Sequence, residues 1–484
     1  MGRTARRLNP LIVACGALLG LAGPSSHARG LAAAGKVDIT PALDTHQVYL
    51  AGFGARGRRP EGVHDPLYAR IVVFSDGKKT VAIAVLDFLG LYRNDVQDLR
   101  RMTRFDKEGR YLFVVAAHQH SAPDTLGMWG PVPGVSGVDH GYMRGVKEKV
   151  AAKVLEVNDK LKPARLRAVV SRVDPRGLCK DIRDPAVIDP DLGVLAVDTP
   201  DGEPVATVVN WSCHAEVLDA SNRLITADYP GALCSAVEER RGGTCVFLPG
   251  SVGGLMTPDV KSRDFGEARR IGSELGGLAL KALADAGPPT VFSVGYKSET
   301  VLVPIENSRH LMFLPSMVFG HKLRNSSGIP LPPSSAYSLP ALHVLRRLKK
   351  HEIPWIETEV SRLDLGPACV LGIPGEVFPE LSMGGYQGQF RAGQALTSPA
   401  NPDPPDLSRA PAGPYLKDLM PCKAKFVVGL ANDELGYLVP DYDFKVPDSL
   451  TLLPRRPGHH YEETNSIGRS ATRIVLDSAR RLLQ

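Results

Sequence analysis

Residue types that bind metals or transfer protons follow four short apolar runs of the sequence. His118 and His120 follow residues 111–117, His214 follows 205–210, Glu376 follows 369–373, and Tyr437 lies shortly after 425–430. The apolar runs have the length and β-branched content of buried strands, and ligands of α/β sheets bind beyond the carboxyl ends of strands. We therefore expect these side chains to meet at one site.

The His-x-His pair formed by His118 and His120 suits a zinc site. Neutral imidazole and carboxylate oxygen both bind zinc at about 2.0–2.2 Å. A catalytic zinc needs several protein ligands and an open position for water, whose pKa the metal lowers to about 7. Residues two apart on a strand point the same way, so both histidines could reach the metal. The alternative interpretation is that each histidine is an ordinary hydrogen-bonded residue of the core or surface.

Two common hydrolase patterns are excluded. The nucleophile elbow of α/β-hydrolases requires Gly-x-Ser-x-Gly, but Pro249 occupies the first glycine position before Ser251. His214 and Glu216 lack the partners of the His-Glu-x-x-His zinc motif. The glycines around Ser251 either let the backbone approach a ligand closely or form a tight structural turn.

The elements that must position these residues alternate along the chain without an internal repeat. The expected strands are 71–75, 81–86, 111–117, 166–171, 193–198, 205–210, 244–248, 369–373 and 425–430, and the expected helices are 142–161, 231–241, 267–286 and 470–483. This order predicts an α/β or mixed α+β fold, with mixed β-sheets and flanking helices in a single large catalytic domain. Residues 306–355 and 393–415 are interrupted by prolines and are expected to form surface loops or lids.

Residues 1–28 have the pattern of a secretory signal peptide. Three arginines precede an apolar run over residues 11–22, and Ser26-His27-Ala28 offers small residues at a cleavage site. The run is too short to cross a bilayer, which needs about 20 residues. This pattern predicts a secreted or periplasmic protein whose domain occupies residues 29–484. Lipoprotein anchoring through Cys15 is the alternative, disfavoured because little apolar sequence precedes that cysteine.

Charge and cysteine content restrict the partners. Loss of residues 1–28 removes three arginines and no acid, so the formal net charge falls from +6 to +3. No basic stripe with interleaved aromatic residues is present, so no nucleic-acid partner is expected. The expected partner is a small-molecule lipid or amide substrate; no second segment suits a membrane span, which leaves contact with a membrane surface open. Export permits disulfides among the six remaining cysteines, but most are expected to be buried small apolar residues.

Five segments resemble, in order, segments of the neutral, non-lysosomal ceramidase family. They are VDITP at residues 37–41 with AGF at 51–53 and DPLYAR at 65–70, HQHSAP at 118–123, SVGGLMTP at 251–258, PGE at 374–376, and GY at 436–437 followed by HYE at 460–462. The order agrees from about residue 36 to residue 470. One such motif is weak evidence, and five in order are fairly specific.

This resemblance implies a zinc-dependent amidohydrolase that cleaves the amide of an N-acyl sphingoid lipid by zinc-activated water. The implied zinc ligands are His118, His214, Glu376 and Tyr437. The implied catalytic residues are His120, which would face the substrate and help hold the oxyanion, together with Thr257 and Arg183, the latter at the position of a substrate-contacting arginine.

The departures from the family pattern concern the substrate more than the metal. Thr257 replaces a serine, Asp124 replaces a residue that is usually glycine, and no immunoglobulin-like domain is expected after the helix at 470–483. Fold resemblance alone does not fix a substrate. Two alternatives therefore stay open: a zinc hydrolase of a different ester, lactone or amide, and a non-catalytic exported binding protein. An apolar segment at 311–319 is either ordinary core or a wall for a lipid chain.

Overall fold

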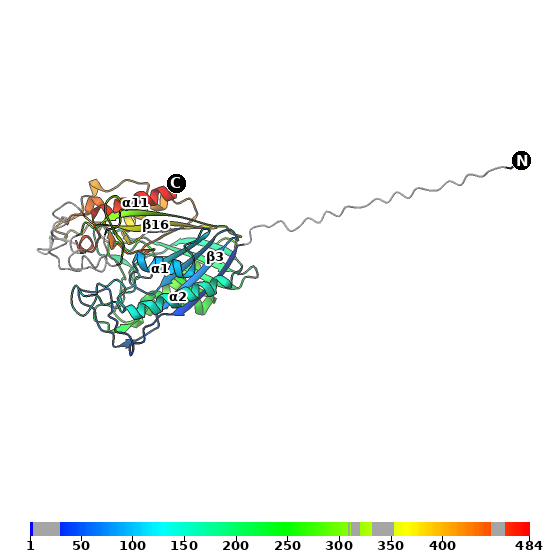
Figure 1. The fold of residues 1–484 in the computed structure, drawn as a ribbon. Coiled ribbons are helices and arrows are strands. Elements are labelled where there is room, and N and C mark those ends of the chain that lie inside the picture. Colours follow the sequence, from blue (N-terminus) through cyan, green and yellow to red (C-terminus); the bar gives the residue numbers. More distant parts are fainter. Residues whose placement is uncertain (3–29, 308–309, 311–319, 332–352, 447–459) are drawn as a thin grey trace.

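Three β-sheets form the frame of the molecule, and helices cover their outer faces (Figure 1). The computed structural model describes residues 1–2, 30–307, 310, 320–331, 353–446 and 460–484. The proposed signal segment and the apolar segment 311–319 lie outside these described residues, apart from Met1 and Gly2.

The first sheet has the strand order β5-β4-β3-β1-β6. Its strands are β1 (Leu31–Asp38), β3 (Tyr68–Ser75), β4 (Thr80–Leu86), β5 (Arg110–Ala116) and β6 (Lys162–Pro163). Strands β4 and β5 are parallel, and the other pairs are antiparallel. Helices α1 (Arg93–Thr103) and α2 (His140–Asp159) cover its outer face, where their apolar stripes bury a cluster that includes Ile71 and Val150.

The second sheet has the order β12-β10-β9-β7 and is covered by two helices. Its strands are β7 (Arg165–Arg172), β9 (Asp191–Asp198), β10 (Pro204–Trp211) and β12 (Thr244–Pro249), and its helices are α3 (Asp228–Arg241) and α4 (Phe265–Ala284). The parallel pair β10–β12 is buried on both faces, which explains its nearly continuous apolar sequence.

The third sheet has the order β14-β16-β17-β19. Its strands are β14 (Val294–Pro304), β16 (Trp355–Leu365), β17 (Ala368–Gly372) and β19 (Ala424–Val428), and the short β15 (Leu323–Arg324) pairs with β16. Helix α11 (Arg469–Leu483) packs on β14 and β16. Figure 1 shows this layer on one side of the molecule, with α1, β3 and α2 on the other.

One apolar core joins the inner faces of all three sheets. It includes Phe74 and Phe113 from the first sheet, Leu195 from the second, and Val370 and Phe426 from the third, all at most 1% exposed. Because a single buried cluster connects the sheets, the chain forms one domain of mixed α+β class, as the sequence predicts.

Short elements complete the fold around the loops. Three two-strand pairs are β2 (Gly62–Val63) with β11 (Leu224–Ile225), β8 (Lys180–Asp181) with β13 (Met256–Thr257), and β18 (Glu376–Val377) with β20 (Tyr437–Leu438). The short helices are α8 (Pro379–Met383), α9 (Leu416–Leu419) and α10 (Tyr461–Thr464), and the 3-10 turns are η2 (Leu407–Arg409) and η3 (Asp441–Asp443).

All nine expected strands and all four expected helices are present, with ends shifted by a few residues. Strands β1, β14 and β16 and helix α1 are present but were not predicted. Residues 393–415 form the expected loop, which contains only the turn η2. In the proline-interrupted stretch 306–355, the described residues include β15 and the first residue of β16.

The cysteines divide as expected between covalent and apolar roles. Cys369 and Cys422 form a disulfide that ties β17 to the segment before β19. Cys179, Cys213, Cys234 and Cys245 are free and buried. Within the ranges that the structure describes, no helix combines the length and apolarity that crossing a membrane would require.

Candidate metal centre

The first two histidines stand on the loop that leaves the parallel strand β5. His118 has a φ of 62°, in the left-handed region that is uncommon for residues other than glycine. The residue is 2% exposed, and its Nδ1 donates a hydrogen bond to the carbonyl of Leu89 at 2.9 Å. This bond places the proton on Nδ1 and leaves the Nε2 lone pair directed at the centre. A strained backbone at such a position is typical of functional sites.

The third histidine reaches the same point from the second sheet. His214 follows β10, is 1% exposed, and donates from Nδ1 to the carbonyl of Met256 at 2.8 Å. A parallel bridge between Gln119 and Ala215 joins this loop to the loop of His118 and His120. The two loops are therefore held together by backbone hydrogen bonds, and their imidazoles converge.

The third sheet supplies a carboxylate and a phenol. Glu376 and Tyr437 are register partners in the parallel pair β18–β20. Glu376 Oε2 lies 3.0 Å from His214 Nε2 and 3.6 Å from His118 Nε2. The Tyr437 hydroxyl lies 3.5 Å from the same His214 nitrogen, and His120 Nε2 lies 3.4 Å from His118 Nε2. The structure thus brings together all five residues that the strand ends predict.

These separations fit one small tetrahedral cation. With metal–ligand bonds of about 2.0–2.1 Å, two ligands of a tetrahedral zinc are about 3.3 Å apart. The separations of Glu376 Oε2 from His214 Nε2 and His118 Nε2, and of the Tyr437 hydroxyl from His214 Nε2, are 3.0, 3.6 and 3.5 Å. Imidazole nitrogen and carboxylate oxygen are also common zinc ligands. The three histidines alone place ligand atoms within 4.8 Å of one another, so they too could hold a metal ion.

The charges of the site favour a cation at its centre. Burial lowers the pKa of His214, but the hydrogen bond and charge of Glu376 outweigh it and raise the pKa to about 9. Burial acts to raise the pKa of Glu376, and the two neighbouring histidines lower it to about 2. A proton on His214 thus lies between His214 and Glu376, where a metal ion bound by both side chains would lie. Burial and the charge of Glu376 raise the pKa of Tyr437 well above its usual value.

His120 differs from the other two histidines in its outer hydrogen bond. Its Nδ1 has no hydrogen-bond partner among the described residues, although Glu216 Oε2 lies 3.5 Å away. Burial, followed by the charges of His118 and His214, lowers the pKa of His120 well below its usual value, so the ring is neutral. Metal-ligating histidines nearly always donate their second N–H to a fixed acceptor. His118 and His214 meet this condition, and His120 does not.

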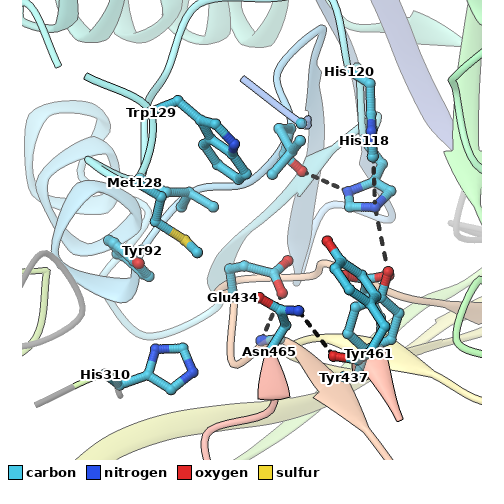
Figure 2. A pocket seen from close by; sticks show the side chains of 15 residues that line it. Tyr92, His118, His120, Met128, Trp129, His310, Glu434, Tyr437, Tyr461 and Asn465 are labelled. Carbon is cyan, nitrogen blue, oxygen red and sulfur yellow. Dashed lines mark hydrogen bonds and ion pairs between the residues drawn. The ribbon is translucent and has the colours of Figure 1, made fainter. Parts of the chain in front are cut away.

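A pocket of about 520 Å³, counted to its open mouth, leads to the histidines. Figure 2 shows Tyr92, Met128 and Trp129 along one wall and His118, His120 and Tyr437 along the other. The full lining consists of Gly52, Leu89, Tyr92, His118, His120, Leu126, Met128, Trp129, His310, Glu376, Glu434, Gly436, Tyr437, Tyr461 and Asn465.

Asp124, which stands where the resembled family usually has glycine, stabilises one wall of this pocket. Its buried carboxylate accepts backbone N–H groups from Leu126, Gly127, Trp129 and Gly137 at 2.8–3.1 Å. This carboxylate therefore fixes the turn that carries Met128 and Trp129. The sequence alone gave no signal for these two wall residues.

Two residues expected in catalysis do not line the pocket. Arg183 is 3% exposed and pairs with Glu462 at 2.6 Å, Glu463 at 3.0 Å and Asp443 at 2.7 Å. It holds α10, whose first residue, Tyr461, does line the pocket. Thr257 is buried on β13, next to the Met256 carbonyl that orients His214.

Glu434 lines the pocket but was not among the predicted site residues. It is 5% exposed, and burial together with the charge of Glu376 raises its pKa well above the usual value. The sequence feature that could have identified Glu434 is its position four residues after Leu430, the last residue of the expected strand 425–430.

The fold itself is that of a known class of structures. No protein-family model matches the chain, and no curated sequence matches it. A crystal structure of neutral ceramidase from Pseudomonas aeruginosa is similar, with a TM-score of 0.63 and 14% identity over 94% of this chain and 74% of that chain. A structure described as ceramidase complexed with C2 gives a TM-score of 0.60 and 14% identity over 94% and 75%. At this identity the likeness establishes a ceramidase-like fold.

Proposed function

We propose that this protein is an exported zinc-dependent hydrolase that cleaves the amide bond of an N-acyl lipid. One observation carries the proposal: buried imidazole, carboxyl and phenol groups from three sheets converge beside a pocket, and their contacts of 3.0, 3.5 and 3.6 Å suit one metal ion. The ceramidase-like fold and the five ordered motifs support an amide as the bond that is cleaved.

In this proposal His118, His214, Glu376 and Tyr437 hold the zinc, and His120 faces the substrate. The outer hydrogen bonds of His118 and His214 support this division, because they fix both Nε2 lone pairs on the centre. When bound, zinc lowers the pKa of a water molecule and polarises a carbonyl group.

His120 would act on the carbonyl oxygen of the amide. In this proposal His120 Nε2 is the donor of the 3.4 Å contact with His118 Nε2, whose lone pair is left free by the Nδ1 hydrogen bond of His118. With the His118 lone pair engaged, that N–H is available to the developing negative charge on the substrate oxygen. A donor preorganised in a buried site can contribute about 100-fold or more to the rate.

The apolar wall supports an acyl chain as part of the substrate. Leu89, Leu126, Met128 and Trp129 line the pocket beside the histidines. Each buried methylene group adds about 0.8 kcal/mol of binding free energy. An N-acyl lipid would place its amide at the histidines and part of its chain along this wall.

Export is proposed from the first 28 residues, whose charged and apolar segments resemble a signal peptide. Expression with the native N-terminus and N-terminal sequencing of protein from the medium or periplasm tests it. A mature N-terminus near Arg29 is expected. An intact Met1 or a lipid on Cys15 contradicts this part of the proposal.

The test of the activity is hydrolysis of a panel of N-acyl lipids, simple amides, esters and lactones. Each substrate is assayed with the protein as purified, after treatment with a chelator, and after zinc is restored. Amide hydrolysis that is lost with chelation and recovered with zinc is expected. Turnover of only esters or lactones supports a different zinc hydrolase, and bound zinc without turnover of any substrate supports a binding protein.

A further inference from the structure

Two buried cysteines contact each other beside the loop that carries His214. Cys179 Sγ lies 3.5 Å from the carbonyl oxygen of Ser212, the residue before Cys213. Cys213 Sγ in turn lies 4.0 Å from the carbonyl oxygen of Leu178, the residue before Cys179. The two thiol groups are also hydrogen-bonded to each other. Each sulfur atom is thus one peptide group away from the other cysteine.

Backbone contacts hold both cysteines in this position. The fully buried Tyr229 donates its hydroxyl to the carbonyl of Cys213 at 2.7 Å, and the N–H of Cys179 donates to the carbonyl of Pro175 at 2.8 Å. Cys179 directly precedes β8, and β13, the partner of β8, supplies the carbonyl that accepts the His214 N–H. The folded chain therefore keeps the two sulfur atoms together.

The other four cysteines after residue 28 also lie in pairs. Cys369 and Cys422 form a disulfide, and the thiols of Cys234 and Cys245 are hydrogen-bonded to each other. Buried cysteines that act only as small apolar residues have no physical reason to meet one another. An even number of cysteines that meet in pairs is typical of exported, oxidised proteins.

We propose that Cys179 and Cys213 form a second disulfide in the mature protein. The inference rests on the proposed export, because disulfides form and persist in oxidising compartments. In the structure both thiols are free and 1% exposed, so the bond must form while the chain folds, before the core closes over them. Bonding requires the sulfur atoms to approach to about 2.05 Å.

The oxidant would be another disulfide, either of a small thiol or of a protein that catalyses disulfide formation in that compartment. One cysteine thiolate attacks this disulfide, releases one thiol and forms a mixed disulfide, from which the second cysteine displaces the other thiol. The two cysteines thereby lose two protons and two electrons, and the oxidant is reduced to two thiols. The new bond would link the residue before β8 to the residue before His214.

Peptide mapping of the full chain tests this bond. One sample is exported with its native N-terminus, and a second is reduced, unfolded and refolded in a mixture of reduced and oxidised glutathione. Free thiols are alkylated under denaturing conditions before digestion with trypsin, which leaves Cys179 in residues 177–180 and Cys213 in residues 184–223. We expect these two peptides to be joined, with a mass two hydrogen atoms below their sum, and to separate on reduction.

The known disulfide and one variant provide the controls. The link between Cys369 and Cys422 should appear in both samples, and refolding with reductant alone should give neither link. In Cys179→Ala, Cys213 should become open to alkylation, while the link between Cys369 and Cys422 is kept.

The glutathione sample separates this inference from the proposed export. An intact Met1 in the first sample contradicts export, and the refolded sample still decides the bond. Alkylation of both Cys179 and Cys213 in the glutathione sample, or a link from either one to a different cysteine, overturns the inference.

Discussion

Glu376 and Tyr437 face each other as register partners of the parallel pair β18–β20, and both direct an oxygen at His214 Nε2. This strand pair, two residues long, thus places side chains from two distant segments of the chain next to each other as possible metal ligands. The opposite half of the centre comes from the loops after β5 and β10, which the bridge between Gln119 and Ala215 joins. The candidate centre therefore depends on how the third sheet docks against the first two.

Loss of a donor from either half should lower the affinity for zinc. His214→Ala and Glu376→Gln are each expected to weaken zinc binding by more than the about 10- to 100-fold that follows from loss of an outer hydrogen bond alone. Zinc content after dialysis, measured by mass spectrometry, checks this. Glu274→Gln on the surface of α4 is the control. Zinc retained at the wild-type level in both variants contradicts the assignment.

His120→Ala should separate metal binding from activity. Because His120 Nδ1 lacks the outer hydrogen bond that the other two histidines make, we expect zinc content to stay near one per chain. The rate of amide hydrolysis should fall by about 100-fold or more, since a preorganised donor is lost. If zinc is lost together with activity, the metal is held by the three histidines instead.

The elements that could be predicted from the sequence are those whose burial is evident from their own residues. Strands such as β5 and β10 are continuous apolar runs, so both their positions and the histidines after them could be predicted. Strand β14 alternates buried and exposed positions irregularly and carries Lys297 and Glu299, so its strand character depends on pairing with β16. Such pairing is a tertiary effect that propensity does not report.

The same reasoning explains which site residues were missed. Metal-binding residue types that directly follow a predicted strand can be recognised in the sequence. Met128 and Trp129 could not be recognised in this way, because they reach the pocket only through the turn that Asp124 closes. Helix α1 was missed because its buried face includes Arg93 and Arg100, which a hydrophobic pattern does not register.

Gly52→Ala should displace His120. A Cβ at Gly52 would lie 2.6–2.7 Å from the Cβ, Cγ and Nδ1 atoms of His120, closer than carbon contacts allow. We expect hydrolysis to fall at least about tenfold, because a small misplacement of a catalytic group is costly. Gly54→Ala is the matched control: it also has a positive φ, but nothing lies within 4 Å of its added Cβ. Equal loss of activity in both variants would mean that backbone strain, and not the position of His120, is responsible.

Catalytic efficiency should rise with the length of the acyl chain. Each added methylene that packs on Leu126, Met128 or Trp129 contributes up to about 0.8 kcal/mol, which is about a fourfold gain. The measurement is kcat/KM over a series of N-acyl chains that differ by two carbons. Met128→Ser should flatten the rise without changing zinc content. A flat series in the wild-type protein, or a preference for short polar amides, argues against a lipid substrate.

The buried ion pairs of Glu359 should make stability depend on acid pH. Glu359, on β16, accepts hydrogen bonds from Arg100 at 2.8 and 2.9 Å and from Arg93 at 3.1 Å. Burial acts to raise the pKa of Glu359, but the charges of these arginines outweigh it and lower the pKa to about 2. A carboxyl whose pKa is lower in the folded than in the unfolded protein stabilises the fold above the unfolded pKa, here 4.5, and this stabilisation is lost as the pH falls through about 2.

Glu359→Gln should therefore lower the free energy of unfolding by about 3 kcal/mol at pH 7, because it removes the stabilised carboxylate and leaves two arginines unpaired. The difference from the wild-type protein should shrink between pH 4.5 and pH 2, since protonation neutralises the same carboxylate in the wild type. Urea denaturation at pH 7, 4 and 3 measures this gap, with Glu274→Gln as a half-exposed control that should change little at any pH. A gap as large at pH 3 as at pH 7 would show that Glu359 stabilises the fold by packing and not by its charge.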